Sequence, residues 1–170
     1  ASVPAMQVRK TFMFTDIVGS TNLASAMGAQ WSNVLQWHDD ALRETFRAHR
    51  GVVVKHLGDG FFVAFDDPSD AIECAVAIQN RLAEHRGSSG FAPHVRIGLH
   101  VADATLKSDD YEGMGVHEAA RIGGIAGTDE ILASKDVLAA VRMRFPVSDT
   151  RTVELKGVPG PVEVAAIEFA

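Results

Sequence analysis

The spacing of apolar residues along the chain predicts both helices and strands. A period near 3.6 residues marks one side of a long helix, formed by Val34, Leu35, His38, Leu42, Thr45 and Phe46. A period of two residues runs through 95–101, which is the pattern of a strand with one face on a core. Two runs rich in β-branched and aromatic residues flank Gly58-Asp59-Gly60, which predicts a hairpin with an acid at its tip.

The full pattern predicts an α+β fold with one mixed sheet. Strands are expected at residues 8–14, 52–57, 61–65, 95–101, 131–133, 152–155 and 162–169. Helices are expected at 31–49, 68–86, 115–126 and 135–141, and 87–90 is expected to be a loop. The first six elements have the β-α-β-β-α-β order of the ferredoxin-like arrangement, to which further C-terminal α and β elements are added.

The composition limits the kinds of protein that this chain can be. With 170 residues, of which 46% are hydrophobic, it is expected to form one domain with a sizeable core. A formal net charge of −6 gives no basic surface for a nucleic-acid backbone, so we expect no nucleic-acid partner. Cys74 is the only cysteine, which excludes a disulfide framework and a thiolate metal cluster. We find no run of about 20 apolar residues and no secretory leader, and we expect a cytoplasmic chain without a membrane segment.

The segment 12–21 combines features of a metal site and a phosphate site. A short apolar strand ends at Asp16, and a turn containing Gly19, Ser20 and Thr21 then opens a helix. A carboxylate at a strand end can hold a hard divalent cation, and free N–H groups at a helix start suit phosphate oxygens. The alternative for this segment alone is a buried strand followed by an ordinary helix cap.

A second acid is expected beside the first. In the predicted sheet the first strand and the hairpin are neighbours, which brings Asp16 at a strand end close to Asp59 at the hairpin tip. Two acids that hold two Mg²⁺ ions are suited to in-line displacement at phosphorus. The alternative for Asp59 is ordinary Gly-Asp-Gly turn chemistry.

Five segments stand in order along the chain: FTDIVGST at 14–21, VKHLGDG at 54–60, RIGLH at 96–100, DYEGMGVHEAAR at 110–121 and LKG at 155–157. Together they resemble the catalytic domain of class III nucleotidyl cyclases, the adenylate and guanylate cyclase family. The resemblance is collinear over about residues 8–168, and the short segment between His100 and Asp110 is similar to the compact bacterial subtype. It implies a catalytic domain at 7–170 preceded by a leader or linker remnant at 1–6, and it allows regulatory domains outside this chain.

The resemblance implies an enzyme that cyclises ATP or GTP and expels pyrophosphate with two divalent ions, Mg²⁺ or Mn²⁺. Asp16 and Asp59 match the family's metal-binding aspartates, and Ile17 supplies a main-chain carbonyl to one metal. The N–H groups of Val18 to Thr21 would hold the β- and γ-phosphates. The ribose 3′-hydroxyl, activated by one metal, would attack the α-phosphorus, and no protein nucleophile is needed.

Three further residues match the family's contacts to the phosphates and ribose. Arg121 matches the arginine that stabilises charge at the α-phosphate in the transition state, and Lys156 matches the lysine on the terminal phosphates. His117 stands where the family has an asparagine that orients the ribose or the reacting phosphate, and an imidazole differs from a carboxamide in shape and reach. We therefore expect an active but slow cyclase. Outside this series, Arg121 and Lys156 would be ordinary surface cations.

Two positions predict the base. Lys55 matches a position that carries lysine in adenylate cyclases and glutamate in guanylate cyclases, and Asp110 matches the second selective position. A lysine donor facing N1 and an aspartate acceptor facing the N6 amino group complement adenine and oppose guanine. ATP is therefore the expected substrate. The neighbouring Asp109 makes the second assignment an alignment choice of one residue.

The resemblance also implies a site shared between two chains. Asp16 and Asp59 would come from one subunit, and the complementary set from the other: Lys55, Asp110, His117, Arg121 and Lys156. One chain carries both sets, so a head-to-tail homodimer with two equivalent sites is expected. The alternatives are a non-catalytic nucleotide-binding or dimerisation module derived from a cyclase, and a guanylate cyclase. Polymerase and cyclic-dinucleotide synthase palms share the metal acids, but they do not explain Lys55, Asp110 and Lys156 together.

Overall fold

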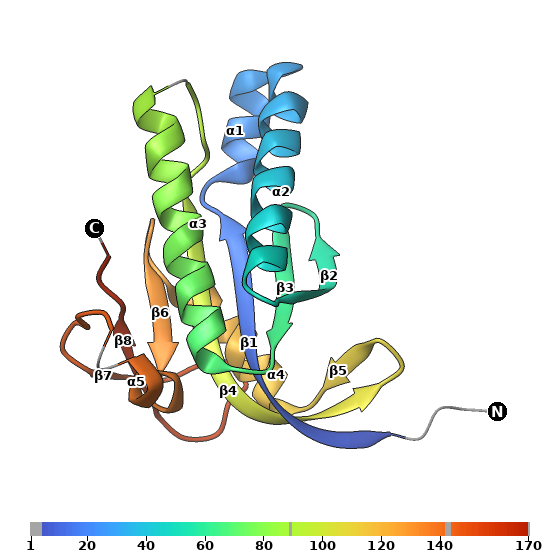
Figure 1. Cartoon of the computed structure of the whole chain (residues 1–170), viewed down its shortest axis with the longest axis vertical. Coiled ribbons are helices and arrows are strands. Elements are labelled where there is room, and N and C mark those ends of the chain that lie inside the picture. The colour runs from blue at the N-terminus through green and yellow to red at the C-terminus, as the bar shows by residue number, and fades with distance from the viewer. Residues whose placement is uncertain (1–4, 89, 142–143, 170) are drawn as a thin grey trace.

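The computed structural model, shown in Figure 1, describes residues 5–88, 90–141 and 144–169. Its described part contains one eight-stranded sheet of order β2-β3-β1-β4-β6-β8-β7, with β5 paired to β4. The strands are β1 (Met6–Ile17), β2 (Val52–Leu57), β3 (Gly60–Phe65), β4 (Val95–Lys107), β5 (Asp110–Glu112), β6 (Ile131–Ser134), β7 (Arg151–Val153) and β8 (Val162–Ala166). The helices are α1 (Ser20–Met27), α2 (Gln30–Ala48), α3 (Pro68–Ser88), α4 (Met114–Ile125) and α5 (Lys135–Val141).

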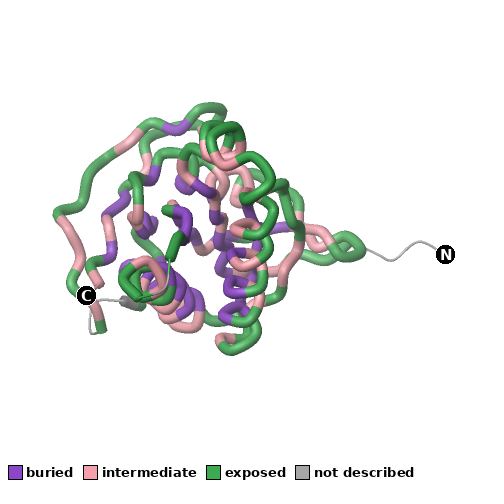
Figure 2. Tube along the Cα trace, turned by 90° about the horizontal axis from the view of Figure 1, so that it is seen from above, coloured by how far each residue is buried: buried purple, intermediate pink, exposed green. Residues whose placement is uncertain are grey.

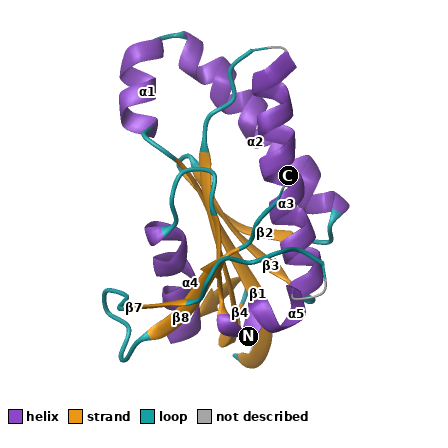
Figure 3. Ribbon diagram, turned by 90° about the vertical axis from the view of Figure 1, so that its left-hand side faces the viewer, coloured by secondary structure: helices purple, strands orange, loops and turns teal. Residues whose placement is uncertain are grey.

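Helices cover the two faces of the sheet unequally. Figure 3 shows α2, α3 and α5 on one face and α4 on the other. The side-chain alternation of β4 produces these two layers: Leu99 packs with Leu42 and Leu82 of the first face, whereas Ala102 packs with Ala119 of α4. Figure 2 shows the buried positions gathered on the strands and on the inner sides of these helices.

The predicted α+β class and the ferredoxin-like order of the first elements are confirmed. β1 pairs antiparallel with both β3 and β4, so the hairpin and the first strand are sheet neighbours as expected. The predicted inner side of the long helix is buried at four of its six positions, His38, Leu42, Thr45 and Phe46. None of the helices in the described part of the chain is both long enough and apolar enough to span a membrane.

Several predicted boundaries were wrong. β4 extends to Lys107 because its alternation continues through the buried Ala102 and Ala104, opposite an early start of β1 at Met6. The polar segment 107–110 is a tight turn that leads into β5, and β5 was not predicted. The loop predicted at 87–90 begins later, since α3 continues through Ser88, and residue 89 lies outside the described residues.

The ends of the chain also differ from the sequence prediction. β7 stops at Val153 and β8 at Ala166, so the terminal hairpin is shorter than expected. Leu155 instead opens a turn, where its carbonyl accepts the N–H of Val158. Of the expected leader or linker remnant, residues 1–4 lie outside the described residues, and Met6 is the first residue of β1.

Candidate active site

The end of β1 and the tip of the β2–β3 hairpin are in close contact. The Phe61 N–H donates a hydrogen bond of 3.1 Å to Thr15 Oγ1, and the two residues are partners in the β1–β3 register. A Cβ at Gly60 would lie 2.4 Å from the Thr15 carbonyl oxygen, so only glycine allows this approach. The residues adjacent to this junction are Asp16 and Asp59, and the structure therefore brings the two predicted metal ligands together.

The two carboxylates influence each other. Burial raises the pKa of Asp59, a side-chain hydrogen bond with Ser20 partly offsets that effect, and the negative charge of Asp16 raises the pKa further. Asp59 Oδ2 is buried and has no hydrogen-bond partner among the described residues. A buried carboxylate oxygen without a donor, next to a second carboxylate, is a position where a cation fits.

Other oxygen ligands would be needed to complete a metal site. The described residues contain no group of three or more His, Cys, Asp or Glu side chains that could hold a metal ion. The Ile17 side chain is buried in the core, which leaves its main-chain carbonyl as the group it could offer, as predicted from the family resemblance. Mg²⁺ ordinarily combines one or two carboxylates with waters and substrate phosphates, so two acids are enough protein carboxylates, and waters and phosphates would supply the other oxygen ligands.

Arg96 was missed in the sequence analysis. It lies opposite Asp16 in the β1–β4 register, and its Nε and Nη2 atoms are 3.1 and 2.7 Å from Asp16 Oδ2. Its Nη1 donates to the Gly124 carbonyl of α4 at 2.9 Å. The guanidinium thus supplies a positive charge to one of the two acids and ties that acid to α4. The register between β1 and β4, which the structure provides, is what identifies Arg96 as the partner of Asp16.

The first turn of α1 presents free N–H groups beside the acids. Gly19 precedes the helix with φ 67°, in the left-handed region, and no side chain caps the helix start. The N–H groups of Ser20 and Thr21 have no partner within the helix. The predicted phosphate-binding set must be corrected at Val18, because its N–H donates to the His94 carbonyl at 2.8 Å.

A small cavity lies beside Asp16 and reaches α4. Its volume is about 200 Å³, and it is lined by Phe14, Thr15, Asp16, Leu57, Gly60, Ala120, Gly123 and Gly124. Pockets that enclose a drug-sized ligand usually measure about 300–1,000 Å³. The cavity therefore accommodates ions and part of a ligand, and a single chain does not enclose a whole nucleotide here.

The two predicted base-recognition residues contact each other. Lys55 Nζ of β2 lies 2.8 Å from Asp110 Oδ2 of β5. This hydrogen bond lowers the pKa of Asp110, and the Tyr111 N–H donates to its other oxygen at 2.8 Å. Asp109 is exposed in the preceding turn and makes no such ion pair. The structure thus pairs Lys55 with Asp110, the residue chosen in the sequence analysis.

The remaining predicted residues gather where α4 meets the β7–β8 connection. His117 Nε2 lies 3.0 Å from the Lys156 carbonyl oxygen. A Cβ at Gly157 would lie 2.7 Å from the same nitrogen, and the φ of +78° also favours glycine there. Arg121, one turn later on the same side of α4, is exposed and has no hydrogen bond or ion pair with the described residues.

The predicted site residues therefore form three separate groups. The acid pair lies at the β1–β3 junction, the Lys55–Asp110 pair at β2 and β5, and the third group at α4 and the turn after β7. No hydrogen bond or ion pair between described residues connects the acid pair to the members of the other two groups: Lys55, Asp110, His117, Arg121 and Lys156.

Comparisons with known proteins agree on one family. A family model described as the adenylate and guanylate cyclase catalytic domain matches residues 5–168. An uncharacterised protein of Mycobacterium tuberculosis is 28% identical over 158 residues, which cover 89% of this chain and 53% of that protein. An adenylate cyclase of Mycosarcoma maydis is 32% identical over 156 residues, covering 74% of this chain and 6% of that protein. The chain thus spans about half the length of the mycobacterial relative.

Solved structures show the same fold. The adenylyl cyclase CyaB from P. aeruginosa superposes with a TM-score of 0.87 at 20% identity, covering 99% of this chain and 97% of that one. The guanylyl cyclase Cya2 gives a TM-score of 0.86 at 23% identity, covering 99% of this chain and 95% of that one. The fold is thus common to structures described as adenylyl and as guanylyl cyclases.

Proposed function

The chain belongs to the adenylate and guanylate cyclase catalytic domain family, and from that membership we propose that it converts ATP to 3′,5′-cyclic AMP and pyrophosphate. The observation that carries the proposal is the Asp16–Asp59 pair, with its buried oxygen that lacks a donor. Residues 7–170 are proposed as the catalytic domain.

The acids and the first turn of α1 would hold the reacting end of the substrate. Asp16 and Asp59, with the Ile17 carbonyl, would bind two divalent ions, Mg²⁺ or Mn²⁺. Bound there, such ions would acidify the ribose 3′-hydroxyl and neutralise the charge of the leaving pyrophosphate. The N–H groups from Gly19 to Thr21 would donate to the β- and γ-phosphates. Arg96 pairs with Asp16 Oδ2, and its guanidinium would have to leave this oxygen for a cation to bind there.

Arg121 and Lys156 are proposed to neutralise charge on the phosphates. Both side chains are exposed, and Arg121 is free of ion pairs with the described residues, so neither must break a strong internal contact to bind substrate. Arg121 would stabilise the charge that develops at the α-phosphate, and Lys156 would bind the terminal phosphates. His117 would orient the ribose or the reacting phosphate from the same side of α4.

The Lys55–Asp110 pair supports adenine over guanine. Adenine presents its N1 acceptor next to its N6 amino donor, and guanine presents the reverse pattern. An ammonium and a carboxylate held 2.8 Å apart offer a donor and an acceptor side by side, and the family resemblance assigns the donor to adenine N1 and the acceptor to its N6 amino group. Guanine would face two mismatched polar groups, each costing about 1–3 kcal/mol.

We propose that the site is completed by a second copy of the chain in a head-to-tail homodimer. The cavity beside Asp16 is about 200 Å³, which is smaller than the about 300–1,000 Å³ of pockets that enclose a drug-sized ligand. The groups proposed to bind base and phosphate make no contact with the acids in one chain. A partner subunit that supplies these groups would enclose the substrate, and the symmetric arrangement would give two equivalent sites.

The decisive experiment identifies the product. The purified chain is incubated separately with ATP and GTP, each with Mg²⁺ or Mn²⁺, and the products are separated and identified by mass. We expect cyclic AMP and pyrophosphate in equal amounts from ATP, and loss of both with Asp59→Asn. Exclusive formation of cyclic GMP would overturn the base assignment. Nucleotide binding without any product would instead identify the non-catalytic module.

A further inference from the structure

Helix α4 lies along β4 through contacts that need glycine at both ends. A Cβ at Gly98 would lie 2.3 Å from the Gly123 nitrogen, and a Cβ at Gly115 would lie 2.3 Å from Ala102 Cβ. The helix and strand backbones therefore approach closely. Small residues give close contact but few side-chain projections, so these two contacts alone provide little resistance to a shift of the helix along the strand.

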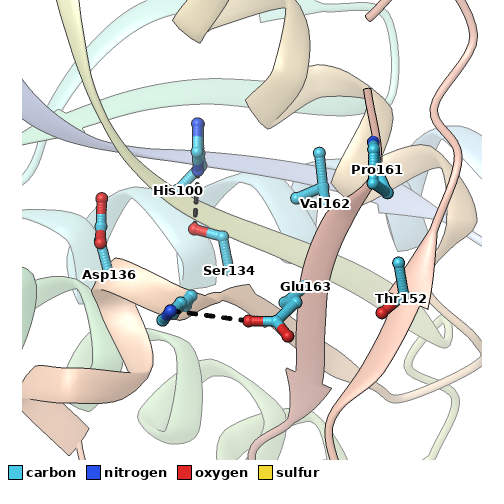
Figure 4. A pocket seen from close by; sticks show the side chains of 8 residues that line it. His100, Ser134, Asp136, Thr152, Pro161, Val162 and Glu163 are labelled. Atoms are coloured by element: carbon cyan, nitrogen blue, oxygen red, sulfur yellow. Dashed lines mark hydrogen bonds and ion pairs between the residues drawn. The ribbon is translucent and has the colours of Figure 1, made fainter. Parts of the chain in front are cut away.

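A polar contact between β4 and α4 lies between the two glycine contacts. His100 is the β4 residue midway between Gly98 and Ala102, and its Nε2 lies 2.9 Å from Glu118 Oε2 of α4. Its Nδ1 lies 2.6 Å from Oγ of Ser134, the last residue of β6. Figure 4 shows His100 and Ser134 directly facing each other at the side of a pocket of about 510 Å³.

A neutral His100 ring satisfies the hydrogen bonds to both Glu118 and Ser134. Burial lowers the pKa of His100, and the Glu118 carboxylate opposes this effect. Asp136 of α5 and Arg9 of β1 act on the ring in opposite senses from farther away. In a neutral ring, Nε2–H donates to the Glu118 carboxylate, and Nδ1 accepts the Ser134 hydroxyl proton. Every polar atom of the imidazole is then satisfied, which makes the arrangement a specific one.

We propose that Glu118 and His100 are positioning residues for the cyclase reaction, because their hydrogen bond fixes α4 along β4. The effect on catalysis rests on the proposed function, whereas the effect on the position of α4 does not. Glu118 is next to His117 and three residues before Arg121 on α4; its carboxylate contacts His100 of the sheet, whereas Arg121 is exposed. A hydrogen bond that fixes the position of α4 on the sheet therefore also fixes the position of the Arg121 guanidinium.

The test compares substitutions that keep or remove the acceptor. Glu118→Gln retains an oxygen that can accept from His100 Nε2–H, and we expect kcat within about 3-fold of wild type. Glu118→Leu removes the acceptor at similar size, and we expect kcat to fall about 10- to 100-fold with KM for ATP changed less than about 3-fold, as for a misplaced transition-state group. Glu44→Gln is the matched control, because that acid pairs with Arg81 on the distant α2–α3 surface.

A second measurement does not depend on activity. Hydrogen exchange of the α4 amides should quicken in Glu118→Leu and stay near wild type in Glu118→Gln, while α2 and α3 remain unchanged in both. Unchanged α4 exchange in Glu118→Leu would overturn the proposal, as would equal kcat losses in the Leu and Gln variants. If wild-type protein makes no cyclic nucleotide, the proposed function fails, and the exchange data still decide whether this hydrogen bond fixes α4.

Discussion

At the scale of single residues, the ion pair between Lys55 and Asp110 determines the proposed base preference. Lys55→Met keeps the length of the side chain but removes the donor to adenine N1. In the proposed enclosed site, a base N1 atom left without its donor costs about 1–3 kcal/mol, so kcat/KM for ATP should fall about 10- to 100-fold, and kcat/KM for GTP should fall less. Steady-state kinetics with both nucleotides measure the ratio. Lys135→Met, at an exposed lysine, is the control, and an unchanged ATP/GTP ratio in Lys55→Met would refute the assignment.

Replacing His117 by the family's asparagine tests how this residue affects turnover. Its imidazole Nε2 lies 3.0 Å from the Lys156 carbonyl oxygen, whereas the family's asparagine would be shorter and would offer an amide NH₂ and a carbonyl oxygen from one carbon atom. We expect His117→Asn to raise kcat, because the carboxamide regains the group that orients the reacting substrate. Turnover of purified enzyme under saturating ATP is the measurement. Equal or lower turnover in the variant, with the fold intact, would refute the expectation that His117 slows the enzyme.

The sequence pattern revealed some residues of the site and missed others for a physical reason. Asp16 and Asp59 could be predicted to meet because each is next to a turn signal and the two strands are predicted neighbours. Arg96, His100 and Glu118 lie within regular elements, where alternation or helical spacing describes their side but not their partner. Their roles depend on which strands pair in which register, and that information is not local in the sequence.

At the scale of elements, Gly60 determines how the hairpin meets β1. A Cβ there would lie 2.4 Å from the Thr15 carbonyl oxygen, so Gly60→Ala forces the hairpin tip away from the end of β1. We expect a loss of about 1–3 kcal/mol in the free energy of unfolding and a fall in cyclase activity larger than the stability loss explains. Chemical denaturation and product formation measure the two effects.

The control for that substitution is Gly87→Ala near the end of α3. A Cβ at Gly87 meets nothing within 4 Å, and alanine favours a helix by up to about 1 kcal/mol over glycine. The free energy of unfolding should therefore rise slightly or stay the same. Equal destabilisation by the two substitutions would contradict the close hairpin contact.

The elements also show where periodicity fails as a predictor. α5 was predicted with both of its ends, and α2 to within one residue at each end, because turn or cap signals bound a helical spacing. β5 was not predicted because it is three residues long and polar, and it forms only by pairing with the extended end of β4. Its existence depends on a partner strand rather than on its own composition.

At the scale of the whole molecule, His38 couples stability to pH. It is fully buried, neither ring nitrogen has a hydrogen-bond partner among the described residues, and burial lowers its pKa to about 4. The unfolded chain, with an ordinary pKa near 6.5, binds this proton more readily, so the stability contribution is complete above pH 6.5 and is lost towards pH 4. Between pH 7.5 and 5 the loss should be about 2 kcal/mol.

Urea denaturation of wild type and His38→Leu at several pH values checks this coupling. The leucine variant keeps a buried side chain of similar size but has no proton to bind. Its free energy of unfolding should therefore fall less steeply with acid than that of wild type. Parallel curves for the two proteins between pH 7.5 and 5 would show that His38 does not titrate on unfolding.

The assembly of two chains can be tested by mixing two inactive variants. Asp16→Ala removes a proposed metal ligand, and Arg121→Ala removes the proposed transition-state cation. If each site takes the acids from one chain and the arginine from the other, a heterodimer of the two variants contains one intact site and one doubly defective site. Random exchange at equal amounts makes half of the dimers heterodimers, so activity should return to about a quarter of the wild-type rate.

The variants are given different tags, and heterodimers are isolated to prove exchange. Isolated heterodimers without activity would show that Asp16 and Arg121 do not act across a subunit boundary.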